Sequence, residues 1–295
     1  MDDKRFAAQY EEYRAAVEEY LTGLFADKMD TAWKTLYESM RYSLLSGGKR
    51  LRPVLTLECA RVSGLADWRA ALPFACALEL VHTYSLIHDD LPCMDDDTLR
   101  RGKPTNHVVY GETMATLAGD ALQPEAYRLI AEAPELDARA KVAAVAALSW
   151  ASGADGMVAG QVLDLTDYGR DRETLNDLCA RKTGCLLRCA ARLGCAAAGA
   201  QPELQHALED YCAALGLAFQ IRDDLLDVVG DEATFGKPIG SDQDEGKTTF
   251  VDLLGADGCE REVQRLTGQA IGALRGIEGT DFLATLARKL MERNK

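Results

Sequence analysis

Two acidic motifs, far apart in the chain, carry the residues best suited to chemistry. The first motif is HDDLPCMDDD at residues 88–97, and the second is FQIRDDLLD at residues 219–227. In the second motif, Asp223 and Asp227 are four residues apart, so they project from one face of a helix. The second motif therefore presents paired carboxylates one helical turn from each other.

The first motif needs a break in its helix to bring its carboxylates together. On a straight helix, Asp89 and Asp95 would point roughly 240° apart. Pro92 removes a backbone N–H and clashes with the carbonyl of His88, so we expect the helix to bend or end there. The later aspartates can then fold back toward Asp89.

Carboxylates at this density favour binding of a hard divalent cation. Like charges beside apolar residues are costly alone and become favourable when cations lie between them. Oxygen-only ligands indicate Mg²⁺, which usually keeps water ligands and bridges to substrate phosphates. The alternative for one such motif is a solvated acidic helix end, but two motifs on apolar helices favour a metal site.

The charge distribution indicates an anionic ligand in an acidic protein. The 295-residue chain has a formal net charge of −14, which makes it a poor partner for nucleic acid or anionic lipid. Three loops nevertheless carry Lys or Arg, namely 46–53, 95–107 and 231–250. Bound metal ions would reverse the local field and let a diphosphate approach.

Apolar residues recur at helical spacing almost throughout, so we predict an all-α protein with one domain spanning residues 1–295. We expect Pro124 to kink the wall of a cavity. The expected helices cover about 33–46, 53–64, 69–91, 111–131, 137–153, 155–165, 173–199, 203–228 and 259–293.

Cysteine use and hydropathy indicate a cytoplasmic protein with no membrane insertion. The nine cysteines form no CxxC pair, and the N-terminus has no apolar signal core, so we expect reduced thiols. Cys185, Cys189 and Cys195 could be imagined as a metal site, but buried thiols explain them better. We expect no stretch as long and apolar as the roughly 18 residues of a membrane helix.

The motifs, taken in order, resemble those of the trans-prenyltransferases, or polyprenyl diphosphate synthases. Within that family the chain is most similar to bacterial farnesyl diphosphate synthases, with geranylgeranyl diphosphate synthases close behind. The matching segments are 47–53 (GGKRLRP), 89–95, 100–105 (RRGKPT), 182–184 (KTG), 223–227 and 246–247 (GK). The resemblance implies the isoprenoid synthase fold, with helices around a central cavity, and a homodimer.

The resemblance also implies roles for individual residues. About three Mg²⁺ ions, or Mn²⁺ in their place, would bind Asp89, Asp90, Asp95, Asp223, Asp224 and Asp227. The diphosphate of dimethylallyl or geranyl diphosphate would contact Arg100, Lys182, Thr183, Gln220, Lys237 and Lys247. Isopentenyl diphosphate would bind at Gly48, Lys49, Arg52, His82 and Arg101.

Two residues before the first motif would set the product length. In the family these positions often form the cavity floor, and here they are Tyr84 and Ser85. A bulky Tyr84 would stop growth near fifteen carbons, although an ordinary core tyrosine is the alternative. His82 lies seven residues before Asp89 and hence about 20° from the same helical face, so it can look into the same cavity. A lone histidine beside Val81 and Tyr84 is otherwise typical of a core residue, and the resemblance favours the cavity.

The implied reaction is head-to-tail condensation of isopentenyl diphosphate with the allylic diphosphate, giving farnesyl diphosphate. The first alternative is a geranylgeranyl product. A terpene cyclase or head-to-head synthase would have less use for the basic loop 47–52. A non-catalytic synthase subunit should have lost ligands that this chain keeps.

Overall fold

The computed structural model describes residues 1–166, 168, 170–229 and 248–292. In this part of the chain the fold is all-α, as predicted, apart from one small hairpin. The α-helices are α1 (Asp3–Gly23), α2 (Lys34–Leu44), α3 (Leu51–Val62), α4 (Leu72–Asp89), α5 (Asn106–Tyr110), α6 (Glu112–Glu132), α7 (Ala138–Ser152), α8 (Met157–Asp164), α9 (Arg172–Cys179), α10 (Cys185–Ala198), α11 (Pro202–Val229), α14 (Phe250–Ala273) and α15 (Asp281–Met291). The shorter elements are the 3₁₀ turns η1 (Ala26–Lys28) and η2 (Trp68–Ala71), the π-helical segment η3 (Ala180–Gly184) and the strands β1 (Leu99–Arg100) and β2 (Lys103–Pro104).

The sequence prediction differs from the fold at both ends of the chain. The predicted helix 259–293 is wrong, because α14 ends at Ala273 and α15 begins at Asp281, with Gly276 and Gly279 at positive φ between them. Helix α1 was not among the predicted ranges, although Phe6, Tyr13, Val17 and Leu21 line its buried face.

Side-chain capping explains where several helices begin. Asp2 accepts from the backbone N–H of Arg5 at 2.9 Å, and Thr249 forms a capping box with Asp252.

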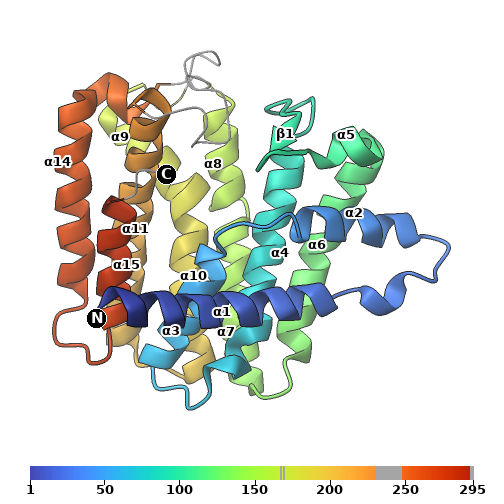
Figure 1. The fold of residues 1–295 in the computed structure, drawn as a ribbon, viewed down its shortest axis with the longest axis horizontal. Coiled ribbons are helices and arrows are strands. Elements are labelled where there is room, and N and C mark those ends of the chain that lie inside the picture. The colour runs from blue at the N-terminus through green and yellow to red at the C-terminus, as the bar shows by residue number, and fades with distance from the viewer. Residues whose placement is uncertain (167, 169, 230–247, 293–295) are drawn as a thin grey trace.

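The middle of the molecule is built around α4, the most apolar of its long helices. Twelve of its eighteen residues are buried, so it is covered on most sides, and it packs against α3, α6 and α10. Figure 1 shows α1 running crosswise to α4, α10 and α14. Glycines permit two close contacts: a Cβ at Gly194 would lie 2.5 Å from the Thr56 carbonyl of α3, and one at Gly119 would lie 2.1 Å from His88 Nε2.

Two long apolar segments differ from what the sequence predicted, and helix α6 contains a proline. The segments Trp68–Asp89 and Ala138–Asp164 are each long and apolar enough to cross a membrane by length and composition, which the sequence reading did not expect. The first is 72% buried inside the protein and serves as a core helix. Helix α6 continues through Pro124 from Glu112 to Glu132.

The cysteines are free, as predicted. All nine carry thiols, and all but Cys93 are buried. Cys185, Cys189 and Cys195 are buried on α10 and belong to the main hydrophobic core, where they pack as small apolar side chains.

Candidate active site

The first acidic motif folds back on itself at the predicted place. Helix α4 ends at Asp89, three residues before Pro92. The backbone N–H of Asp95 donates to the carbonyl of Asp89 at 2.9 Å, which returns the chain to the helix end. Asp96 completes the turn with a positive φ of 52°, a conformation that a non-glycine residue adopts only under local constraint.

Asp90 points at an arginine of the hairpin. Its side chain is buried and accepts from Arg100 Nε at 2.7 Å, while Arg100 Nη2 also donates to Asp97 at 3.2 Å. The strands β1 and β2 pair Arg100 with Lys103 and so fix the arginine beside the motif. Asp90 thus orients Arg100, a task that the sequence reading did not give it.

The ionised form of the Asp89 carboxylate is disfavoured in this protein. Burial raises its pKa to about 6, and the nearby Asp95 carboxylate acts in the same direction, while Lys182 opposes the shift. A carboxylate in such a place gains from a cation more than a solvated one does. This is the behaviour expected of a metal ligand.

A mostly apolar cavity of about 380 Å³ lies beside Asp89. Several predicted site residues from separate parts of the chain line it: Arg52, His82, Tyr84, Ser85, Asp89, Lys182 and Thr183. Its apolar lining comes from Leu86, Met94, Met157, Val158, Val162, Leu165 and Leu186. The prediction that His82 and Asp89 look into one cavity is confirmed.

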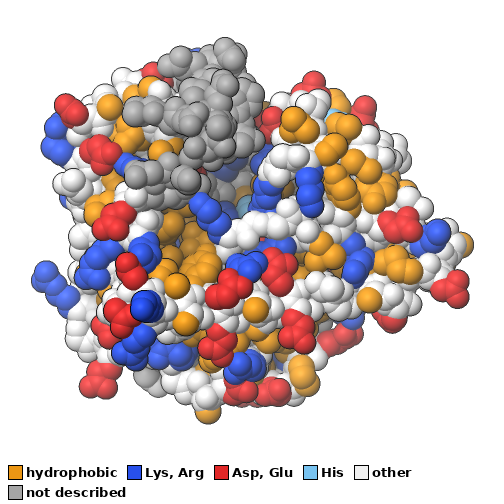
Figure 2. Space-filling model, viewed as in Figure 1, with side chains coloured by type: hydrophobic (Ala, Val, Ile, Leu, Met, Phe, Trp, Pro, Cys, Tyr) orange, Lys and Arg blue, Asp and Glu red, His pale blue; other side chains and the backbone are white. Residues whose placement is uncertain are grey.

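The cavity adjoins a cluster of cationic groups. Arg52 Nη1 lies 3.3 Å from His82 Nε2, and Arg52 Nε is buried without a partner among the described residues. Burial, with the charges of Arg52 and Arg101, holds the pKa of His82 well below its usual value, so the imidazole is neutral. Figure 2 shows Lys and Arg side chains gathered around a hollow on this face. An unpaired guanidinium N–H beside further positive charge is a ready donor for an anion.

The glycine loop brings Arg101 over the start of α3. Arg101 Nη1 donates to the Gly47 carbonyl, and a Cβ at Gly48 would lie 2.7 Å from that guanidinium nitrogen. Gly48 has a φ of 125°, a backbone conformation that favours glycine, and a side chain there would displace the Arg101 guanidinium. This explains Gly48 as a residue that lets Arg101 approach.

Lys182 is held by a carboxylate that the sequence reading missed. It lies in the π-helical segment η3, and its Nζ contacts Asp164 Oδ2 at 2.5 Å. Gly160 lets helix α8 pack closely against η3, because a Cβ at that position would lie 2.2 Å from the backbone nitrogen of Lys182. In the sequence, Gly160 lies four residues before Asp164, so both share one helical face; this spacing was the signal that could have indicated the contact. Irregular helices of this kind are frequent at functional sites.

The second acidic motif is linked to the cavity through hydrogen bonds. Thr183 Oγ1 lies 3.3 Å from Gln220 Oε1, and Gln220 Nε2 donates to Asp224 at 2.9 Å. The second oxygen of Asp224 accepts from the backbone N–H of Phe250 at 2.9 Å, which anchors α14. Gln220 and the three aspartates of this motif are absent from the cavity lining itself.

Asp227 in the second motif has a carboxylate oxygen that the described part of the protein leaves unsatisfied. Its side chain is buried, and its Oδ1 has no hydrogen-bond partner in the described part of the chain. A buried carboxylate oxygen without a donor is costly unless a cation or water satisfies it. The described residues hold no cluster of three His, Cys, Asp or Glu side chains that could hold a metal ion by themselves. The raised pKa of Asp89 and the unsatisfied oxygen of Asp227 would instead suit Mg²⁺ that completes its shell with water and phosphate oxygens. Lys237, Lys247 and nearly all of loop 231–250 lie outside the described residues.

Comparison with known proteins gives consistent matches over most of the chain. The family described as "Polyprenyl synthetase" matches residues 33–276. The farnesyl diphosphate synthase of Escherichia coli K12 is 43% identical over 267 residues, covering 88% of this chain and 89% of that protein. The geranylgeranyl diphosphate synthase of Cyanophora paradoxa is 43% identical, covering 80% and 79%. The crystal structure of geranylgeranyl pyrophosphate synthetase from Pyrococcus horikoshii superposes with a TM-score of 0.89 at 30% identity, covering 98% and 99%.

The raised pKa of Asp89 predicts how stability depends on pH without metal. Between its unfolded pKa of 3.8 and its folded pKa of about 6, the folded chain holds a proton that the unfolded chain has lost. Folding is therefore favoured at low pH, and this contribution is lost as pH rises through 6. Asp89→Asn should remove that dependence and raise the free energy of unfolding at pH 7 by about 1–2 kcal/mol, since water still reaches part of the carboxylate.

Chemical denaturation in the presence of a chelator, at pH 4.5 and pH 7, measures this. The matched control is Asp30→Asn, which removes one exposed carboxylate and should leave stability unchanged at both pH values. An Asp89→Asn variant that is no more stable than the parent at pH 7 would contradict the electrostatic account.

Proposed function

The chain belongs to the polyprenyl synthetase family, and on that premise we propose that it condenses isopentenyl diphosphate with dimethylallyl or geranyl diphosphate, giving farnesyl diphosphate. One observation carries the proposal. A single apolar cavity brings together Asp89, Lys182, Arg52 and His82 from three separate parts of the chain. A ligand with an anionic head and a hydrocarbon tail suits such a cavity.

Mg²⁺ is the cofactor that the carboxylates fit. We assign Asp89 and Asp95 in the first motif, and Asp223 and Asp227 in the second, as the residues that would hold it. Asp90 and Asp224, which also accept from Arg100 and from the backbone N–H of Phe250, are assigned to the same metal site. When bound, the ions would act as Lewis acids that neutralise charge on the departing diphosphate.

The basic residues divide between two diphosphates. Arg100, Lys182, Thr183 and Gln220 lie near the acidic motifs, and we assign them to the allylic diphosphate together with Lys237 and Lys247. Gly48, Lys49, Arg52, His82 and Arg101 are assigned to isopentenyl diphosphate. The neutral His82 can donate one hydrogen bond, and Arg52 offers its unpaired Nε–H.

The protein's part in the reaction is to stabilise charge, align the reactants and exclude water. Lys182 and Arg100 stabilise the negative charge that develops as the allylic C–O bond breaks. The two subsites hold the double bond of isopentenyl diphosphate near the electron-poor allylic carbon, so that a C–C bond forms. A proton is then lost, most simply to the released diphosphate. The apolar walls keep out water, which would otherwise capture the carbocation.

Product length should depend on Tyr84. Its side chain is 5% exposed, lines the cavity and packs edge-on against the His88 ring at 5.8 Å. Ser85, beside it on α4, lines the same cavity and donates to the His82 carbonyl at 2.9 Å. We assign the aromatic ring as the floor that stops growth near fifteen carbons. The similarity to a geranylgeranyl diphosphate synthase makes a twenty-carbon product the second candidate.

We further propose one domain for the whole chain, a cytoplasmic location and a homodimer. The family match from residue 33 to 276 leaves no internal boundary, and the free cysteines suit a reducing compartment. The homodimer is the assembly that the family resemblance implies.

Incubation of the purified chain with Mg²⁺, isopentenyl diphosphate and dimethylallyl diphosphate should yield farnesyl diphosphate, identified by chromatography. Excess chelator should abolish turnover, and added Mg²⁺ should restore it. A cyclic hydrocarbon formed from the allylic substrate alone would favour a cyclase. A chain that is inactive by itself and required only beside another synthase would favour the non-catalytic subunit.

Removing the ring at Tyr84 should lengthen the product. Tyr84→Ala opens the cavity below the allylic site, so the major product should shift from fifteen to twenty carbons. The control is Tyr84→Phe, which keeps the ring and should keep the fifteen-carbon product. An unchanged product from the alanine variant would show that another residue forms the floor.

A further inference from the structure

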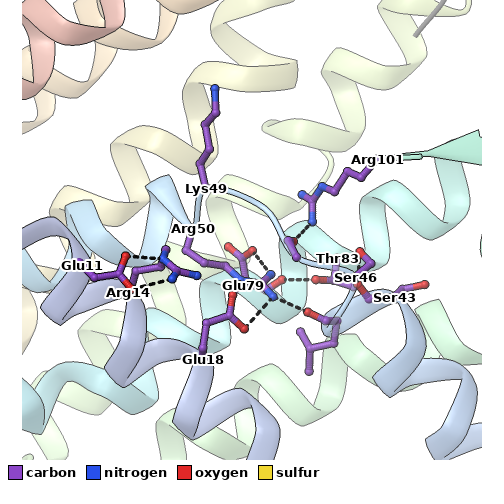
Figure 3. A network of polar contacts seen from close by, with 12 residues as sticks. Glu11, Arg14, Glu18, Ser43, Ser46, Lys49, Arg50, Glu79, Thr83 and Arg101 are labelled. Carbon is purple, nitrogen blue, oxygen red and sulfur yellow. Dashed lines mark hydrogen bonds and ion pairs between the residues drawn. The ribbon is translucent and has the colours of Figure 1, made fainter. Parts of the chain in front are cut away.

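Helix α1 lies against the loop that begins the isopentenyl diphosphate subsite. The family match starts at residue 33, so α1 itself is outside the matched region, whereas the residues that it contacts are inside. Figure 3 shows Glu18 of α1 meeting Arg50, which also meets Glu79 of α4. Lys49 and Arg50 lie three and two residues before Arg52.

Arg50 is the fixed point of this network. It adopts a left-handed conformation with a φ of 51°, which is unusual for a residue with a side chain. Its guanidinium is buried and donates to Glu18 of α1 at 2.9 Å, to Glu79 of α4 at 2.8 Å and to the Leu44 carbonyl at 2.7 Å. These three bonds hold Arg50 inward, and its neighbour Lys49 points away from the network (Figure 3).

Tyr10 fixes the backbone one residue earlier. Its hydroxyl donates to the Lys49 carbonyl at 2.7 Å, across 39 residues of sequence. Burial and the nearby Glu79 raise the pKa of Tyr10 to about 12, so the hydroxyl keeps its proton at neutral pH. The position of Lys49 is therefore set from α1 on one side and by Arg50 on the other.

Helix α1 is rigid enough to serve as a reference for the loop. Its buried residues Phe6 and Tyr13 belong to the main hydrophobic core. Tyr13 and Gln9 also donate to Glu58 of α3, at 2.8 and 2.9 Å. Helix α3 carries Arg52. Its contact with α1 therefore fixes Arg52 relative to Lys49 and Arg50, which α1 also contacts.

We propose that Tyr10 and Glu18 are positioning residues for the isopentenyl diphosphate subsite. They act through the Lys49 carbonyl and the Arg50 guanidinium and set where Lys49 and Arg52 present their charges. This inference rests on the proposed function, because it names part of that same site. The residues assigned to the allylic diphosphate lie on other segments, and Tyr10 and Glu18 make no direct contact with them in the described contacts.

Steady-state kinetics of Tyr10→Phe and Glu18→Gln test the inference. Each variant should raise KM for isopentenyl diphosphate about 5- to 20-fold, while KM for the allylic substrate and kcat stay within about twofold. Tyr10→Phe removes one hydroxyl and no charge. Glu18→Gln makes the region more positive, so a charge effect alone would lower KM for isopentenyl diphosphate, whereas lost positioning raises it.

Glu11→Gln is the matched control. Glu11 lies on the same helix and pairs only with the exposed Arg14 in the described contacts, so both KM values should be unchanged. A thermal melt of every variant shows whether a change in KM comes with loss of structure. Equal changes in both KM values, or a lower melting temperature without a selective rise, would overturn the positioning role.

The outcome separates the two proposals. A parent chain that forms no condensation product would overturn the proposed function and with it this inference. A parent chain that is active, with variants whose KM for isopentenyl diphosphate is unchanged or lower, would overturn the positioning role alone.

Discussion

Burial of charge at the edge of an apolar cavity is the constraint on which the rest of the site depends. Asp89 sits at the end of the most apolar long helix, where a carboxylate is disfavoured, and Asp227 has an oxygen with no donor in the described structure. On the other side, Arg52 has a buried N–H without a described partner. Each group is costly in isolation. A ligand that carries both cations and phosphate oxygens would satisfy groups of both kinds, and this is the reason for proposing a metal–diphosphate complex.

The scaffold maintains this unfavourable arrangement through contacts away from the substrate. Asp164 holds Lys182, Asp90 holds Arg100, and Glu18 with Glu79 holds Arg50. Three of the four non-glycine residues with positive φ in the described chain are Arg50, Asp96 and Arg101, all beside the site. Backbone strain of this kind costs about 1–3 kcal/mol per residue and persists where surrounding contacts enforce it.

Local chemistry made part of this site predictable from the sequence. Pro92 forced the break that returns Asp95 to Asp89, and the spacing between His82 and Asp89 placed both in one cavity. The pairing of Lys182 with Asp164 depends on how α8 packs against η3, which spacing alone does not determine. The hairpin that presents Arg100 is two residues per strand, too short for a periodic signal. The segment between Ala273 and Asp281 contains glycines, but the sequence on both sides of it has helical spacing, so the break was read as part of one helix.

The most direct test of the account is to locate the metal with its anionic ligand. Crystals grown with Mn²⁺ and inorganic diphosphate can be measured for anomalous scattering, which identifies the ions without reference to activity. The account predicts Mn²⁺ between the diphosphate and the carboxylates of both motifs, including Asp89 and Asp227. Ions bound to one motif alone, or a diphosphate bound far from the cavity, would contradict it.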